Sequence, residues 1–191
     1  MAERIFDGKF LKIDRADNGY EIVRVSNAVA ILVYHPLRGI LLVSQDRASM
    51  IDLTTPEGTI LEVVAGRLDK PLTLGEIILD ELECEAGITA NEKDIVFVQE
   101  GALATSPGIS TERMYLAYVA INDDNLIGND GDTFGDAKEG ERIKRRWVSV
   151  SEAINMQWQD LKSWALFRWF LNSQQTIVSD EPTGMFCSDC D

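Results

Sequence analysis

Two glutamates, Glu81 and Glu85, stand four residues apart in the segment 73–87 and could bind a metal ion together. In an α-helix, residues four apart lie on one face, one turn from each other. Two carboxylates in that position repel each other, whereas a divalent cation such as Mg²⁺ would be held by both, because hard cations prefer oxygen ligands. The spacing fits a metal site, and it fits equally two exposed acids on an acidic protein.

The surrounding sequence predicts the helix that this arrangement needs. Thr73 and Glu76 form a T-x-x-E capping box, and Gly87 can adopt the left-handed conformation that ends many helices. At about 100° of rotation per residue, one apolar flank is expected to pack on a sheet; it consists of Ile78, Leu79, Leu82 and Ala86. Glu81 and Glu85 lie beside this flank with Cys84, and the solvated side carries Glu76, Asp80 and Glu83.

Elsewhere the sequence predicts mostly strands, with two further helices near the end of the pattern. Strand patterns cover 9–14, 20–26, a hairpin over 27–47 that turns at 35–39, a single strand over 58–66, and 94–104, 113–121 and 142–150. A short helix is expected at 149–156 and an aromatic-rich helix at 160–174. The acidic, glycine-rich stretch 122–141 is expected to be a long loop, and loops of that length are often functional.

Composition and charge restrict the classes of function. The 191 residues carry a formal net charge of −14, which argues against a nucleic-acid partner. No apolar run approaches the roughly 20 residues that span a bilayer. The first residues are acidic and lack the apolar core of a signal peptide, and three cysteines are too few for a disulfide scaffold. We therefore expect a cytoplasmic protein without a membrane or nucleic-acid partner.

The stretch 66–88 resembles the signature of the Nudix hydrolase family, G-x5-E-x7-R-E-U-x-E-E-x-G-U, where U is a bulky aliphatic residue. The positions that match at the correct spacing are Gly66, Glu81, Leu82, Glu85, Gly87 and Ile88. Three positions differ. Leu72 replaces the first Glu, Asp80 replaces the Arg, and Cys84 replaces the first Glu of the pair.

Flanking segments resemble one branch of that family, the ADP-ribose and nucleotide-sugar pyrophosphatases. They are LLVSQDR at 41–47, LEVVAG at 61–66, SPGISTE at 106–112, and EGERI at 139–143 followed by VSVSEA. The resemblance implies a Nudix-type α/β/α sandwich around a mixed sheet over residues 27–175. It also implies a small N-terminal β extension, 1–26, of a kind often exchanged in a homodimer. Residues 176–191 are expected to be a disordered polar tail.

The resemblance further implies metal-dependent cleavage of the diphosphate bond of ADP-ribose or a nucleotide-sugar. The implied ligands of Mg²⁺, or of Mn²⁺, are the Ala65 carbonyl, Glu81, Glu85 and Glu141. Glu139 is the implied general base, with Glu141 as its stand-in. The implied substrate-binding residues are Arg47, Arg67, Ser106, Pro107, Gly108 and Glu112. An aromatic side chain of the N-terminal extension could stack on the base, and the candidates are Phe6, Phe10 and Tyr20.

The three differences have unequal consequences. Leu72 and Asp80 replace two residues that commonly pair in the family, and losing both partners of a pair can be nearly neutral. Cys84 puts a soft thiol where a hard carboxylate should hold Mg²⁺, which should weaken at least one metal site. We expect hydrolysis to persist with reduced activity and a weakened metal requirement. The alternative is a Nudix-shaped pseudoenzyme that binds a nucleotide or a protein without cleaving it.

Other features are open to several interpretations. The helix at 160–174 is apolar around much of its circumference, which fits burial, a subunit interface or a partner surface. Cys187 and Cys190 form a C-x-x-C pair, which lacks the four ligands of a structural zinc site. The acidic stretch 123–136 resembles a Ca²⁺ loop in composition but not in ligand spacing, and a solvated lid fits it better.

Overall fold

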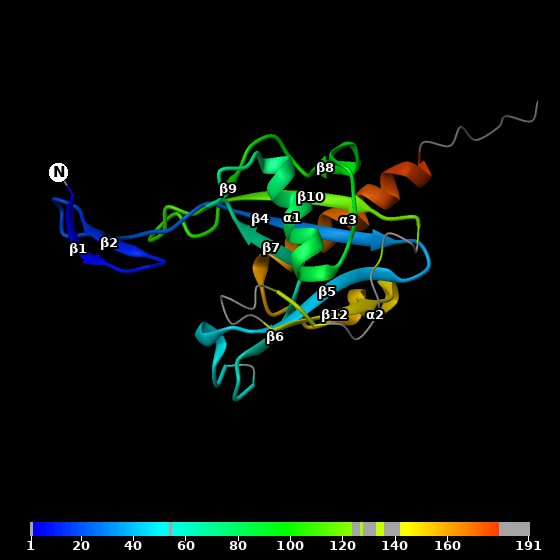
Figure 1. Cartoon of the computed structure of the whole chain (residues 1–191), viewed down its shortest axis with the longest axis horizontal. Helices are drawn as coiled ribbons and strands as arrows, with labels where there is room; N and C mark the ends of the chain where they lie inside the picture. Colours follow the sequence, from blue (N-terminus) through cyan, green and yellow to red (C-terminus); the bar gives the residue numbers. More distant parts are fainter. Residues whose placement is uncertain (1, 54, 124–126, 128–132, 136–141, 180–191) are drawn as a thin grey trace, which may run out of the picture.

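The computed structural model describes residues 2–179 except 54, 124–126, 128–132 and 136–141. Its strands form two sheets. The small one is antiparallel, in the order β1-β2-β3, and consists of β1 (Glu3–Asp7), β2 (Lys12–Arg15) and β3 (Glu21–Arg24). Figure 1 shows it at one end of the molecule, apart from the larger sheet.

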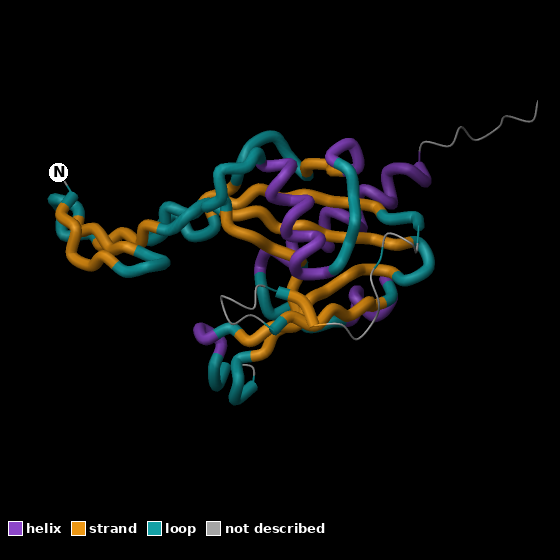
Figure 2. The backbone as a smooth tube through the Cα atoms, viewed as in Figure 1, coloured by secondary structure: helices purple, strands orange, loops and turns teal. Residues whose placement is uncertain are grey.

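The large sheet is mixed, since β10 runs parallel to β4 and the other pairings are antiparallel. Its central order is β11-β12-β5-β4-β10-β8, with β6 on β5, β7 on β4 and β9 on β10. The bounds are β4 Ala28–His35, β5 Gly39–Asp46, β6 Thr59–Glu62, β7 Val64–Arg67, β8 Ile95–Phe97, β9 Leu103–Ala104, β10 Arg113–Ala120, β11 Thr133–Phe134 and β12 Ile143–Val148. Figure 2 shows these strands running through the body of the protein.

Helices cover both faces of this sheet. They are α1 (Leu74–Ala86), α2 (Val150–Asn155) and α3 (Leu161–Ser179), and single 3-10 turns lie at Ala48–Met50 and Glu92–Asp94. Successive side chains of a strand point to opposite faces, and β4 accordingly divides its buried residues between two cores. Val29, Ile31 and Val33 pack in the core with α1, while Ala30 and Leu32 pack in the core with α3. The protein therefore has a mixed α/β fold, with helices on the two faces of one sheet.

The structure corrects several sequence predictions. The stretch 58–66 forms two strands rather than one, and 94–104 likewise divides into β8 and β9. A first strand, β1, precedes those expected. Helix α3 continues to Ser179, so the helix enters the stretch assigned to the tail. No helix in the described part of the chain is long and apolar enough to cross a membrane.

The aromatic helix α3 is partly buried. Leu166, Phe167 and Phe170 are buried against the sheet, whereas Leu161 and Trp164 are exposed. Within this core, Tyr118 of β10 has its ring 5.5 Å from that of Trp169 and 6.0 Å from that of Phe170. Burial against the sheet therefore accounts for one flank of the helix and leaves a second flank in solvent.

Candidate active site at the meeting point of two strands and two helices

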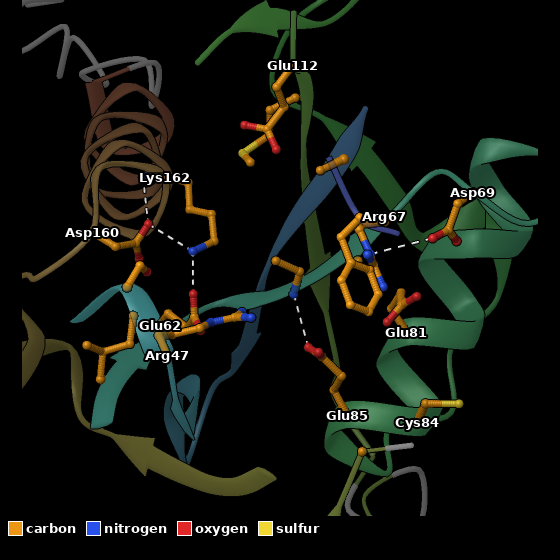
Figure 3. Close-up of a pocket in the computed structure, with 18 of the residues that line it drawn as sticks. Arg47, Glu62, Arg67, Asp69, Glu81, Cys84, Glu85, Glu112, Asp160 and Lys162 are labelled. Carbon is orange, nitrogen blue, oxygen red and sulfur yellow. Dashed lines mark hydrogen bonds and ion pairs between the residues drawn. The ribbon is translucent and has the colours of Figure 1, made fainter. Parts of the chain in front are cut away.

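One large cleft, of about 970 Å³, lies where β6, β7, α1 and the start of α3 come together. Figure 3 shows its charged side chains projecting from these elements. The charged lining residues are Arg47, Glu62, Arg67, Asp69, Lys70, Glu81, Glu85, Glu112, Asp160 and Lys162. The cleft thus combines carboxylates and cations within reach of one ligand.

A change of strand partner creates the floor of the cleft. Strand β6 pairs with β5, and β7, which starts after the single residue Val63, pairs with β4. At the switch, the Val63 amide donates to the Ser163 hydroxyl of α3 at 2.9 Å, so this buried N–H keeps a partner. The switch brings Glu62, from the end of β6, and Ala65, from β7, to the same cleft.

Gly66 allows Glu81 to lie directly against the β7 backbone. A Cβ added at Gly66 would lie 2.2 Å from Cδ of Glu81 and 2.5 Å from its Oε1, closer than atoms can approach. Helix α1 starts at the expected capping box, in which Thr73 Oγ1 accepts from the Glu76 amide at 3.2 Å. The glycine and the cap together fix where the Glu81 carboxylate enters the cleft.

Glu85 is the more deeply buried of the two helix glutamates. Its Oε2 accepts a hydrogen bond from the Ala65 amide at 3.1 Å, which connects the helix directly to β7. The end of the helix is held as well, because Arg145 Nη1 donates to the Ala86 carbonyl at 2.9 Å. A cation at a helix C-terminus also interacts favourably with the helix dipole. Glu81 and Glu85 therefore both face the cleft, as the sequence predicted.

Lys70 joins the loop after β7 to α1. Its Nζ contacts the Asp80 carboxylate and lies 3.3 Å from Glu81 Oε1. These contacts, with Asp80 foremost, hold the pKa of Lys70 above its ordinary value of 10.5. The sequence analysis placed Asp80 on the solvated side and did not single out Lys70. The structure instead contains a loop-to-helix ion pair in which the loop carries the cation, while Leu72 is exposed.

Cys84 is exposed, and its sulfur lies 3.9 Å from Asp80 Oδ1. Partial desolvation, followed by the charge of Asp80, raises the pKa of this thiol above its ordinary 9.0. The thiol is therefore protonated near neutral pH, and metal ions bind the thiolate. Figure 3 shows the sulfur pointing away from the Glu85 carboxylate. Cys84 supplies no hard ligand, as the sequence predicted.

The opposite wall contains a chain of ion pairs around Glu62, which is almost fully buried. Its Oε1 accepts from Arg47 Nε at 2.7 Å, and its Oε2 accepts from Lys162 Nζ at 2.5 Å. Lys162 also contacts Asp160 Oδ1 at 2.9 Å, and Asp160 accepts from the Ser163 hydroxyl. The sequence analysis missed Glu62, although an acid within the apolar run 58–66 was a signal.

The substrate-binding residues implied by the resemblance divide between two hollows. Arg47, Arg67 and Glu112 line the cleft. Pro107 and Gly108 instead line a separate hollow of about 560 Å³. The Ser106 carbonyl accepts from the amides of the turn, Ile109 at 3.1 Å and Ser110 at 2.8 Å.

The N-terminal aromatic residues are divided in the same way. Phe10 lines the cleft, where the Arg67 guanidinium lies 5.1 Å from its ring centre. Tyr20 lines the second hollow. Phe6 is exposed and lines neither. Strand β3 is tied to the loop of that hollow, because the Val23 amide donates to the Ile109 carbonyl at 2.8 Å.

Four singled-out residues, Glu139, Glu141, Cys187 and Cys190, lie outside the described residues. So does most of the acidic stretch 123–136. The described Gly135, just before Glu139, donates its amide to the Cys84 carbonyl at 2.9 Å and lines the cleft.

The donors in the cleft fit a magnesium ion that is completed by a ligand. Glu81, Glu85 and Ala65 offer oxygen atoms, and Mg²⁺ commonly binds one or two carboxylates together with substrate phosphates. Among the residues that the structure describes, no group of three or more His, Cys, Asp or Glu side chains could hold an ion. The side chains of the described residues alone therefore make an incomplete coordination shell.

Comparison with known proteins gives no family assignment, since no model of a known protein family and no curated protein matches this chain. The fold and the cleft define the class that can be stated: a mixed α/β protein with a charged ligand-sized cleft at a switch of strand partners.

Proposed function

We propose that this protein is a metal-dependent hydrolase of Nudix type. Its substrate would be ADP-ribose or a nucleotide-sugar, and its products a nucleoside monophosphate and a sugar phosphate. The observation that carries the proposal is the fit between Gly66 and Glu81, together with the contact of Glu85 with Ala65. Gly66, Glu81 and Glu85 occupy matching positions of the signature, and Ala65 directly precedes it.

The cleft also suits a diphosphate ligand. Its volume falls within the roughly 300–1,000 Å³ of small-molecule sites. Arg47, Arg67, Lys70 and Lys162 bring four cations to a protein of net charge −14. Six carboxylates line the same cleft, so these cations would need a bound divalent ion beside them to make the local field favour an anionic ligand. The planar forks of the two arginines match phosphate oxygens, and the Phe10 ring beside Arg67 offers an apolar surface for a base or sugar.

In the proposed reaction, Glu81, Glu85 and the Ala65 carbonyl would hold the metal ion. When bound, such an ion lowers the pKa of water and neutralises charge on the phosphates. Arg47 and Arg67 orient the diphosphate and stabilise charge that develops on its oxygens. Glu139, which lies outside the described residues, takes the proton from the attacking water as a phosphorus–oxygen bond of the diphosphate bridge breaks.

The direct test is incubation with Mg²⁺ or Mn²⁺ and ADP-ribose, ADP-glucose, GDP-mannose or UDP-glucose, with products separated by chromatography. We expect a nucleoside monophosphate and a sugar phosphate from at least one substrate. Glu85→Gln should abolish turnover, whereas the surface variant Glu152→Gln should retain it. No turnover of any substrate by the wild type at high protein concentration would exclude the enzyme.

The second candidate is a pseudoenzyme that binds a nucleotide without cleaving it. Two observations favour it: Cys84 offers no carboxylate, and Arg47 is already held by Glu62. Nucleotide binding that needs no metal and leads to no turnover would support it. Activity that first arises on Cys84→Glu would show that only the missing ligand separates this chain from an enzyme.

A homodimer is part of the proposal. The small sheet carries exposed apolar side chains, namely Ile5, Phe6, Phe10, Leu11 and Tyr20, and β1 is exposed along its length. Apolar side chains gathered in solvent often mark an interface, and a second copy of this chain could cover them. Light scattering should give twice the mass of 21.3 kDa, and Phe6→Asp should reduce it.

A further inference from the structure

The Lys70 ammonium lies where two acids of α1 meet the loop after β7. It contacts Asp80 on one side and Glu81 Oε1, at 3.3 Å, on the other. The contact with Glu81 belongs to the wall of the cleft, since Lys70 and Glu81 both line it. The carboxylate that the signature would give to a metal ion therefore already has a cation beside it.

The neighbouring residues favour this position of the cation. Asp80 holds Lys70 by a second carboxylate, so that the ammonium stays at Glu81 when the cleft contains no ligand. Glu81 lies directly against the backbone at Gly66, which has no Cβ to push its carboxylate out of the cleft wall. Cys84 offers no further carboxylate that could draw a divalent ion to this side.

We propose that the Lys70 ammonium takes the place of a divalent cation at Glu81. Of the three metal ligands proposed above, only Glu85 and the Ala65 carbonyl would then hold the single metal ion of the site. The part of this inference that concerns catalysis rests on the proposed function. An ammonium has three N–H donors, and Asp80 and Glu81 occupy two of them, which leaves one for a phosphate oxygen. Lys70 would thus orient the substrate and reduce the metal requirement.

The test measures Mn²⁺ binding by electron paramagnetic resonance in the absence of substrate. Wild type should bind one Mn²⁺ ion. Lys70→Met removes the competing ammonium, and it should tighten Mn²⁺ binding by about fivefold or add a second ion.

Lys12→Met is the matched control, because Lys12 also pairs with an acid, Asp7 at 2.9 Å, and its side chain is 48% exposed against 42% for Lys70. That variant has the same net charge as Lys70→Met and should bind Mn²⁺ as wild type does. In the double variant Lys70→Met/Glu81→Gln the tighter Mn²⁺ binding should disappear, because the Glu81 carboxylate that Lys70 had contacted is then missing. Circular dichroism confirms that each variant is folded before binding is compared.

Equal Mn²⁺ binding by wild type and Lys70→Met would overturn the inference, and so would an equal gain in Lys12→Met. Since binding is measured without turnover, the two proposals fail separately. If Lys70→Met binds Mn²⁺ more tightly but the protein cleaves no substrate, the inference is supported and the proposed enzymatic function is refuted. If the wild type is active but Lys70→Met leaves Mn²⁺ binding unchanged, the proposed enzymatic function stands and the inference is refuted.

Discussion

Arg47 and Glu62 are joined by a hydrogen bond of 2.7 Å between Nε and Oε1, so a residue expected to bind phosphate is already held by a buried carboxylate. The same carboxylate accepts from Lys162, which is itself mostly buried. A buried carboxylate between two cations positions both of them before a ligand arrives. The wall that would bind a diphosphate is therefore preorganised by Glu62.

Removing the charge of Glu62 should destabilise the protein. Glu62→Gln leaves Lys162 and Arg47 without their carboxylate, and we expect a loss of about 2 kcal/mol in the free energy of unfolding, most of it from the less exposed Lys162. Urea denaturation measures the loss. The control Glu152→Gln breaks an exposed pair with Arg146 and should cost about 0.5 kcal/mol or less. Equal effects of the two variants would contradict the buried ion network.

Gly66→Ala should separate stability from function. The added Cβ collides with the Glu81 side chain, which can rotate away, so the expected cost in stability is about 1 kcal/mol. The displaced carboxylate should lower any diphosphatase rate by about a hundredfold. Gly108→Ala is a stability control, since its added Cβ meets no atom within 4 Å. Full activity in Gly66→Ala would show that the position of Glu81 does not matter.

The small N-terminal sheet should loosen in acid. Hydrogen bonds from Arg4 and Arg24 to the Asp14 carboxylate hold the pKa of Asp14 below its ordinary 3.8. Stability from such a group is complete above its unfolded-state pKa and is lost as the pH falls from there toward the folded-state pKa. Amide hydrogen exchange in β1–β3, corrected for intrinsic rates, should accelerate below pH 3.8. Asp14→Asn should show weak protection at every pH.

Cys84 should react slowly with alkylating reagents, which attack the thiolate. The raised pKa leaves less thiolate at pH 8 than an ordinary thiol has. In a Cys187→Ser/Cys190→Ser background, we expect Asp80→Asn to lower the pKa and speed the reaction, because Asp80 raises it. Lys70→Met should slow the reaction, because Lys70 lowers that pKa. Rates against pH, measured by mass spectrometry, give the pKa directly; an unchanged rate in both variants would contradict the electrostatic cause.

Sequence reasoning succeeded where the signal was local. The capping box at Thr73 and Glu76 is formed, and Gly87 ends the helix in the left-handed region at φ 59°. The apolar flank of α1 is confirmed for Ile78, Leu82 and Ala86, whereas Leu79 is only partly buried and Ile77, which was not predicted, is buried. Each of these features depends on residues within one or two turns of the helix, which the sequence displays directly.

Sequence reasoning failed where a structural feature depends on segments that are distant in the sequence. Nothing within 58–66 marks the break at Val63, because the break is set by which neighbouring strands, β5 and β4, are available to pair. The partners of Lys70 and Glu62 likewise depend on how loops and helices meet. The family assignment and the roles of Glu139 and Glu141 stay predictions.

The hydrogen bond between Val63 and Ser163 ties helix α3 to the floor of the cleft. A shift of α3 would therefore move Val63, where the chain passes from β6 to β7. It would also change the distance between the wall that carries Glu81 and Glu85 and the wall that carries Arg47 and Lys162. Truncating α3, or binding a protein to its exposed flank at Trp164, would therefore change the affinity of the cleft for its ligand, although neither change touches the cleft directly.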